Sequence, residues 1–269
     1  MAEILFTDMD GTLLLNDSTV SAEMKETLDR FTAAGHRLAL SSGRALDSIL
    51  RVMKQEGLFY PGALVIANNG SLIHDCDSGS SLWERRVPLD VAAKIIEAAD
   101  RRGIHIHTFT EHEIVCRQED TELRDYRLRS PLPVILTPDL LSVLPEPPYK
   151  LHTIHLSDKA ALEGLKAEVE TLCAGEITAQ FSNDRYLEFF HPEAGKGNAL
   201  RQACAYLHIP VEESVAAGDA PNDISMLQAA GTGVAMANAA PEVKAAAGFI
   251  TRLDNDHNGL MEAIAAFFD

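Results

Sequence analysis

The segment Ile4–Thr12 constrains this chain most, because an apolar run passes directly into two carboxylates, a glycine and a hydroxyl. The run Ile4–Thr7 predicts a buried strand, and Gly11 predicts that the chain turns after it. In open α/β sheets ligands bind beyond the carboxyl ends of the strands, so Asp8 and Asp10 are predicted to lie where chemistry takes place. Two such close carboxylates repel each other unless a cation lies between them, and Mg²⁺ is the natural candidate. Taken alone, the segment also fits an ordinary strand whose carboxylates are solvated.

The composition of the chain argues against several classes of partner and indicates where the protein is expected to be found. The chain has 269 residues, enough for two domains, and a net charge of −17, which argues against nucleic acid as a partner. An anionic substrate would need local positive charge from a metal, a lysine and helix amino termini. No segment is long and apolar enough for a signal peptide or a membrane span, so we expect no membrane partner. Cytoplasmic, reduced thiols are expected because the four cysteines show no CxxC spacing: Cys76, Cys116, Cys173 and Cys204.

Polar residues also follow the second and third predicted strands. The apolar strand ending at Ser41 is followed by Ser42 and Gly43 at the start of a helix, where free backbone N–H groups and a hydroxyl can bind an anion. Ser42 could equally serve as an ordinary helix cap. The next strand runs into Asn69 and Gly70, which predict a hairpin turn and place Asn69 at a further strand end.

Two later segments also place polar or charged residues after an apolar strand or at the start of a helix. Lys196 stands between two glycines at the start of a helix, where a lysine can direct its charge at a phosphate, although solvent exposure is the default for this residue. The apolar strand 214–217 is followed by Asp219, Asn222 and Asp223. A helix N-cap needs only one such residue, so the group indicates a site.

Between these segments the pattern changes. From Leu82 to Arg185 the strands alternate polar and apolar residues, which predicts a sheet with one solvated face. We therefore expect an α+β domain of residues 82–185 inserted into a core domain of residues 1–81 and 186–269. Its histidines lie at strand spacing and are expected to face outward rather than to bind a metal: His105, His107, His152 and His155.

In order and placement the motifs resemble those of the haloacid dehalogenase superfamily of phosphatases, and they anchor about two thirds of the chain. The insert resembles the type-two cap of its Cof-like, type IIB sugar-phosphatase branch. The resemblance implies a Rossmann-like, doubly wound parallel-sheet core with an inserted α+β cap of type C2. Its four motifs are Asp8-Met9-Asp10-Gly11-Thr12, Ser42, Lys196, and Gly218-Asp219 with Asn222-Asp223.

The resemblance also implies roles for these residues. Asp8 is the expected nucleophile, and Asp10 the acid and base that protonates the leaving alcohol and activates water. Asp8, Asp219 and the backbone carbonyl of Asp10 would bind Mg²⁺, with Asp223 orienting Asp219 or a metal-bound water. The expected phosphoryl-binding groups are Ser42, Gly43, Lys196, Asn222 and the Met9 N–H.

Within that superfamily the presence of Asp10 sets the chain apart from dehalogenases, which lack this second aspartate. The expected activity is hydrolysis of a small phosphorylated metabolite, sugar phosphates first. A sugar phosphomutase of the phosphomannomutase type is the alternative, and it would need arginines for a second phosphate, for which Arg124, Arg127 and Arg129 are candidates. A solvated helix face explains these arginines equally well. A non-catalytic phosphate-ligand sensor is the second alternative. The sequence does not indicate an oligomeric state.

Overall fold

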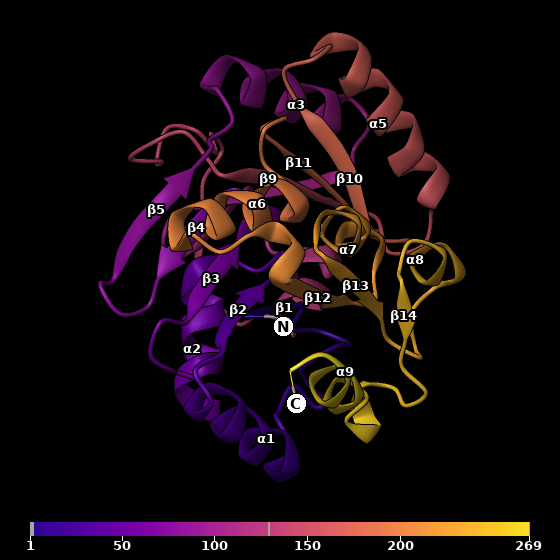
Figure 1. The fold of residues 1–269 in the computed structure, drawn as a ribbon. Coiled ribbons are helices and arrows are strands. Elements are labelled where there is room, and N and C mark those ends of the chain that lie inside the picture. The colour runs from indigo at the N-terminus through magenta and orange to yellow at the C-terminus, as the bar shows by residue number, and fades with distance from the viewer. Residues whose placement is uncertain (1–2, 129, 269) are drawn as a thin grey trace. The chain divides into compact units, whose positions relative to one another are not determined.

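A computed structural model describes residues 3–128 and 130–268, and it divides the chain into two compact units. Residues 3–43, 49–84 and 195–268 form the first, which we call the core unit. Residues 44–48, 85–128 and 130–194 form the second, which we call the insert unit. Each unit is built on a β-sheet of its own (Figure 1).

The sheet of the core unit contains eight strands within the described residues, in the order β14-β13-β12-β1-β2-β3-β4-β5. The strands from β14 to β3 run parallel, and β4 and β5 extend one edge in antiparallel fashion. β1 is fully buried, as an interior parallel strand covered on both faces must be. The strands are β1 (Ile4–Thr7), β2 (Arg37–Ser41), β3 (Leu64–Ala67), β4 (Leu72–Asp75), β5 (Ser80–Glu84), β12 (Ser214–Gly218), β13 (Thr232–Ala235) and β14 (Phe249–Ile250).

Helices cover both faces of this sheet, with α1, α2 and α9 on one face and α6 and α7 on the other (Figure 1). α1 begins where Ser21 accepts a hydrogen bond from the N–H of Met24 at 3.0 Å, and it buries Met24, Leu28 and Phe31. The doubly wound α/β core that the sequence predicts is therefore confirmed. The helical segments are α1 (Ala22–Ala33), α2 (Leu46–Glu56), η1 (Asn68–Gly70), α6 (Lys196–Leu207), η2 (Val211–Glu213), η3 (Pro221–Asp223), α7 (Ile224–Ala229), α8 (Pro241–Ala245), η4 (Asn255–His257) and α9 (Leu260–Phe267).

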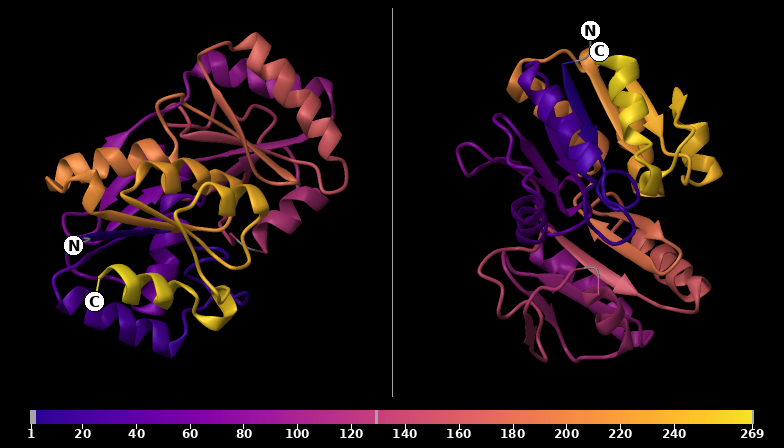
Figure 2. Two further views of the ribbon diagram at one scale, coloured as in Figure 1. Left: turned by 45° about the vertical axis from the view of Figure 1, so that its right-hand side comes forward. Right: turned by 90° about the horizontal axis from the view of Figure 1, so that it is seen from below.

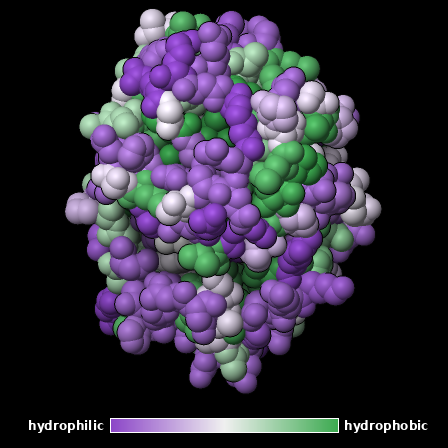
Figure 3. Space-filling view, turned by 180° about the vertical axis from the view of Figure 1, so that it is seen from behind, coloured by the Kyte–Doolittle hydropathy of each residue, from purple (hydrophilic) through white to green (hydrophobic). Residues whose placement is uncertain are grey.

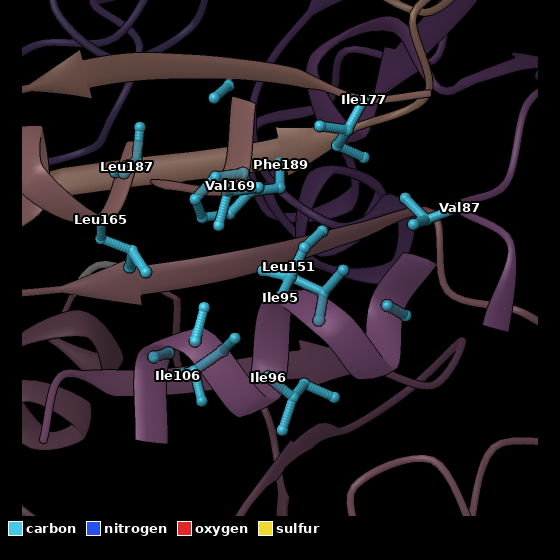
Figure 4. Close-up of a cluster of buried hydrophobic side chains, with 14 of the residues drawn as sticks. Val87, Ile95, Ile96, Ile106, Leu151, Leu165, Val169, Ile177, Leu187 and Phe189 are labelled. Carbon is cyan, nitrogen blue, oxygen red and sulfur yellow. The ribbon is translucent and has the colours of Figure 1, made fainter. Parts of the chain in front are cut away.

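The insert unit is an α+β structure, as the sequence predicts. Its sheet has the order β10-β11-β9-β6-β7-β8, antiparallel except for the pair β7 and β8. α3 and α5 lie side by side on one face (Figure 2), and their apolar side chains meet those of the strands in one core (Figure 4). The elements are α3 (Leu89–Arg101), β6 (His105–Phe109), β7 (Ile114–Cys116), α4 (Thr121–Arg127), β8 (Val134–Leu136), β9 (Lys150–Ile154), α5 (Lys159–Leu172), β10 (Thr178–Asn183) and β11 (Tyr186–Phe190).

The boundaries of the insert differ from the expected residues 82 and 185. β11, expected in the core domain, pairs with β9 and β10 in the sheet of the insert unit. Its apolar pattern does indicate an interior strand, but such a pattern does not say which sheet the strand joins. At the other boundary, β5 pairs with β4 and stays in the sheet of the core unit up to Glu84.

The expectation that the histidines face outward is wrong for His107 and His152, which are 0% and 1% exposed. Tyr126 of α4 covers this face of the sheet, with its ring centroid 4.8 Å from that of His107 and 5.0 Å from that of His152. His105, also on this face, lies 2.7 Å from Asp120 through Nδ1. Sequence alternation predicts two faces for a strand, but not that a short helix covers the polar one.

The buried His152 should make the free energy of unfolding depend on pH. Burial lowers the pKa of His152 to about 3, whereas an unfolded histidine titrates near 6.5. Between these values the unfolded chain binds a proton that the folded chain does not, so the free energy of unfolding falls as the pH falls. We expect His152→Phe to reduce the fall between about pH 7 and about pH 4.5 by roughly 2 kcal/mol, measured by urea denaturation. Equal falls in the variant and the wild type would contradict this.

Hydrophilic side chains cover much of the face shown in Figure 3, with hydrophobic ones in separate patches between them.

Charged side chains are rarely buried unless they are paired, and buried examples in this chain follow that rule. Lys150 pairs with Glu188 in the insert unit, and Lys196 pairs with Asp8 in the core unit. No helix of the described residues combines the length and apolar character needed to cross a bilayer.

Candidate active site

The site lies at the carboxyl edge of the parallel strands of the core unit. Asp8 follows β1 directly, and its N–H donates a hydrogen bond of 2.9 Å to the carbonyl of Ala217 in β12. This bond extends the ladder between the two strands by one residue, so the backbone of Asp8 is held by the sheet. The Asp8 side chain is buried, with the residue only 6% exposed.

Lys196 supplies the positive charge at this position. Its Nζ lies 2.5 Å from Oδ1 of Asp8 and 2.6 Å from Oδ1 of Asp223, and the residue is 1% exposed. Lys196 is the first residue of α6, and the following Gly197 is packed so closely that a β-carbon there would overlap the carbonyl of Ser225. The glycine thus brings the start of α6 against α7, and this close packing buries the lysine.

The loop after β12 supplies the other carboxylates. Oδ2 of Asp223 accepts hydrogen bonds of 3.0 Å from the N–H groups of Asp219 and Ala220, which fixes the loop in shape. Oδ1 of Asp219 accepts a hydrogen bond of 2.8 Å from the hydroxyl of Thr12. Gly11 has a φ of +83°, which favours glycine, and a β-carbon there would lie 2.5 Å from Oδ2 of Asp219, so a larger residue would displace this carboxylate.

Three carboxylates of this site lie close enough together to hold a divalent cation. Ligand oxygens of Asp8, Asp219 and Asp223 all lie within 4.8 Å of one another. Burial raises the pKa of Asp8 well above its ordinary value and that of Asp219 to about 7, and neighbouring carboxylates add to both shifts. Lys196 opposes these shifts but is a single charge. A cation among these oxygens would favour the ionised forms, so the donor set fits a hard metal ion.

Asp10 is placed differently from Asp8. Its side chain is exposed, and it does not belong to the group of three carboxylates. Its negative charge is nevertheless close enough to raise the pKa of both Asp8 and Asp219. Between the two aspartates, Met9 is fully buried, and its carbonyl accepts hydrogen bonds from the N–H groups of Thr12 and Leu14. The turn therefore places Asp8 in buried surroundings and Asp10 in solvent-exposed ones.

The expected phosphoryl-binding residues lie on neighbouring loops. Ser42 is 2% exposed, and its N–H donates to the carbonyl of Ile66 at the end of β3. Asn222 is 7% exposed, and its Nδ2 donates a hydrogen bond of 3.0 Å to Oδ1 of Asn69. A β-carbon at Gly43 would lie 3.0 Å from the same oxygen of Asn69. The structure thus places Gly43 and Asn222 against the side chain of Asn69, whose backbone N–H donates a hydrogen bond to the carbonyl of Ser42.

Two residues with structural roles at the site were not assigned from the sequence. Thr12 belongs to the first motif and donates to Asp219, as described above. Asn238 follows β13, and its Nδ2 donates a hydrogen bond of 2.8 Å to the carbonyl of Gly11. Asn238 carries the same signal as the assigned residues, a polar side chain shortly after an apolar strand, and this signal could have identified it.

Fold and site together define a class of protein. A doubly wound parallel sheet carries a buried cluster of carboxylates with a lysine at its carboxyl edge, and the chain between two of its segments forms a separate α+β unit. Residues 5–264 match the family model of the haloacid dehalogenase-like hydrolases. The chain belongs to this family, which confirms the resemblance found in its motifs.

Known proteins similar to the chain agree with this assignment. The putative phosphatase YxeH of Bacillus subtilis is 30% identical over 277 residues, covering 98% of this chain and 97% of that protein. The 5-amino-6-(5-phospho-D-ribitylamino)uracil phosphatase YwtE of Bacillus subtilis is 31% identical over 291 residues, covering 97% and 95%. A solved haloacid dehalogenase-like hydrolase from Bacteroides thetaiotaomicron has a TM-score of 0.89 at 30% identity and covers 100% of both chains.

Proposed function

We propose that this chain is a magnesium-dependent phosphatase that hydrolyses small phosphate monoesters, sugar phosphates among them, through an aspartyl phosphate on Asp8. Its class, phosphoric monoester hydrolase, is that of its phosphatase relatives. The observation that carries the mechanism is the surroundings of Asp8, which is buried at the end of β1 with Lys196 Nζ at 2.5 Å and two further carboxylates close by. A phosphate monoester repels nucleophiles, and such a site can neutralise its charge.

In the first half of the reaction, an oxygen of Asp8 attacks phosphorus and the bond to the leaving alcohol breaks. Asp10, in its protonated form, gives its proton to the leaving oxygen. Its exposure suits this role, because the group must reach both the substrate and water. Lys196, the hydroxyl of Ser42, the backbone at Gly43, the carboxamide of Asn222 and the N–H of Met9 stabilise the charge on the transferring phosphoryl group.

In the second half, Asp10 accepts a proton from water while the water oxygen attacks phosphorus, which releases inorganic phosphate and restores the carboxylate of Asp8. Asp8, Asp219 and the backbone carbonyl of Asp10 would hold Mg²⁺, and Asp223 would orient Asp219 or a metal-bound water. When bound, the ion supplies positive charge beside the phosphoryl oxygens. The hydrogen bonds from the N–H groups of Asp219 and Ala220 to Asp223 support that orienting role.

Small phosphorylated metabolites are the proposed substrates. The relative YwtE is named for a substrate with a phosphorylated ribityl group, which supports a phosphorylated polyol or sugar. With a net charge of −17, the protein repels nucleic acids at long range, so a compact substrate is favoured.

The test is phosphate release from a panel of phosphorylated metabolites that includes sugar phosphates, nucleotides and pyridoxal phosphate, with Mg²⁺ and with EDTA. We expect turnover with Mg²⁺ and a loss of at least about 100-fold in EDTA, because the phosphoryl charge is then poorly neutralised. Turnover that is equal in EDTA would contradict the role of the metal. The ranking of substrates would identify the preferred class.

Two other results would replace this proposal. Conversion of glucose 1-phosphate or mannose 1-phosphate to an isomeric phosphate, with little free phosphate, would indicate a mutase. Of the arginines that a mutase could use, Arg124 and Arg127 lie on α4 and contact Glu119, and Arg129 lies outside the described residues. No turnover by folded, metal-bound protein would indicate a sensor.

A further inference from the structure

We propose that Asn69 is a positioning residue of the active site, which orients the carboxamide of Asn222 and fixes the Ser42–Gly43 loop against it. This inference rests on the proposed function, because it concerns how the phosphoryl group is held. It is drawn from a buried turn of the core unit, η1, that contacts three of the segments assigned to the site.

The turn has an unusual backbone. Asn68, Asn69 and Gly70 follow one another with φ of +51°, +56° and +89°, a region that few residues other than glycine and asparagine adopt readily. All three residues are buried. A β-carbon at Gly70 would overlap the carbonyl of Gly195, so the turn packs directly on the residue before Lys196. The backbone of this turn therefore restricts its three positions to asparagine and glycine.

Asn69 joins the second and fourth motifs through both its backbone and its side chain. Its N–H donates a hydrogen bond of 3.0 Å to the carbonyl of Ser42. Its Oδ1 accepts a hydrogen bond of 3.0 Å from Nδ2 of Asn222, and the same oxygen lies against Gly43. At Gly43 a larger residue would press on this oxygen, so the loop and the two carboxamides form one packed group.

The bond to Asn69 has a direct consequence for Asn222. A carboxamide nitrogen carries two hydrogens, and Oδ1 of Asn69 takes one of them. This fixes the plane of the Asn222 carboxamide and leaves its second N–H able to donate to a phosphoryl oxygen. Without Asn69 the carboxamide could rotate, and the donor would have to be ordered when substrate binds.

Unpaired atoms in the same group point to a ligand. Among the described residues, Nδ2 of Asn69 and Oδ1 of Asn222 have no hydrogen-bond partner, although the residues are 1% and 7% exposed. Buried polar atoms without a partner are uncommon and costly in proteins, so those that exist call for an explanation. An oxygen-rich ligand with a hydroxyl or water beside it would satisfy both a donor and an acceptor.

The experiment compares Asn69→Gly with Asn68→Gly. Glycine keeps the left-handed backbone in each case, so the two variants share the backbone change and differ in the side chain removed. We expect Asn69→Gly to lower kcat/KM about tenfold and to weaken binding of orthovanadate, a phosphate mimic, by a similar factor, which corresponds to the loss of one hydrogen bond. Asn68→Gly should change both by less than about twofold, because the hydrogen bond from Asn222 goes to the side chain of Asn69 and not to that of Asn68.

A double-mutant cycle separates positioning from a general loss of structure. If Asn69 acts through Asn222, Asn69→Gly should have little further effect in an Asn222→Ala background. Fully additive effects, or an Asn69→Gly variant that matches the wild type in kcat/KM and in vanadate binding, would overturn the inference. If the wild type hydrolyses no phosphate ester, the proposed function fails. The role of Asn69 can then still be tested, by measuring how much orthovanadate with Mg²⁺ raises the Tm of each protein. An equal increase in wild type and variant, or none in either, would overturn the role of Asn69.

Discussion

Replacing Asp8 by asparagine should abolish turnover, with a fall in kcat of at least about 10⁴-fold on the best substrate of the panel. The amide keeps the shape of the side chain but cannot attack phosphorus to form an acyl phosphate. The remaining residues still bind and neutralise the phosphoryl group, so KM should change far less than kcat. The measurement is steady-state phosphate release in the presence of Mg²⁺.

The same variant should remain folded, and its free energy of unfolding in EDTA should not fall. Burial raises the pKa of the Asp8 carboxyl, with Lys196 opposing and the nearby carboxylates adding to the shift. An acid whose pKa is raised in the folded state weakens folding once the pH exceeds its unfolded value, so removing its charge relieves that cost. Asp17→Asn, in an exposed position of the following loop, is the matched control and should keep full activity. Comparable losses in both variants, or residual turnover well above about 0.01 per cent in Asp8→Asn, would contradict the assignment.

Lys196→Met should cause the second large loss, about 10³-fold in kcat/KM, and it should also destabilise the fold. Burial alone would lower the pKa of this lysine, but Asp223 and Asp8 raise it above its ordinary value, so it stays charged between them. Removing it leaves buried carboxylates without a counter-charge, which typically costs about 3–5 kcal/mol. Activity would fall because the transferring phosphoryl group loses a fixed positive charge.

Added Mg²⁺ should restore part of the lost stability in Lys196→Met, because a cation bound to Asp8 and Asp219 replaces some of the missing charge. The measurement is urea denaturation with Mg²⁺ and with EDTA, beside assays of kcat/KM. Lys166→Met is a suitable control, since Lys166 lies on α5 with its side chain 33% exposed and 3.8 Å from Glu170. A Lys196→Met variant as stable as this control in EDTA would show that the lysine does not neutralise the cluster.

The three carboxylates that the structure brings together, Asp8, Asp219 and Asp223, could be located from the sequence because the signal that marks them is local. A parallel strand buried on both faces must be apolar, so Asp8 directly after Ile4–Thr7 and Asp219 directly after Ser214–Gly218 stand out in the sequence. Parallel strands share a carboxyl edge, and this brings such residues together whatever the length of chain between them. The α/β core followed from its apolar strands, and the inserted α+β unit followed from the change to alternating polar and apolar residues along the chain.

Features that depend on pairing between distant segments could not be predicted in this way. β11 has the pattern of a buried strand, and only its pairing with β9 and β10 assigns it to the insert unit. His107 and His152 alternate with apolar residues as exposed positions do, but Tyr126 of α4 covers them. β8 has only three residues, too few to show a periodicity that would predict a strand. The contact between Asn69 and Asn222 likewise joins residues 153 positions apart.

The most direct test of Asp8 as the nucleophile is chemical trapping of the phosphoenzyme in the variant Asp10→Asn, with 4-nitrophenyl phosphate and Mg²⁺. This substrate needs little protonation of its leaving group, so the first step should proceed, whereas hydrolysis should slow without Asp10 as the base and the intermediate should accumulate. Acid quenching and borohydride reduction would convert an aspartyl phosphate to homoserine, which peptide mass spectrometry locates. We expect homoserine at position 8 in the presence of substrate and none when substrate is omitted. An unmodified Asp8, or homoserine at another aspartate, would contradict it.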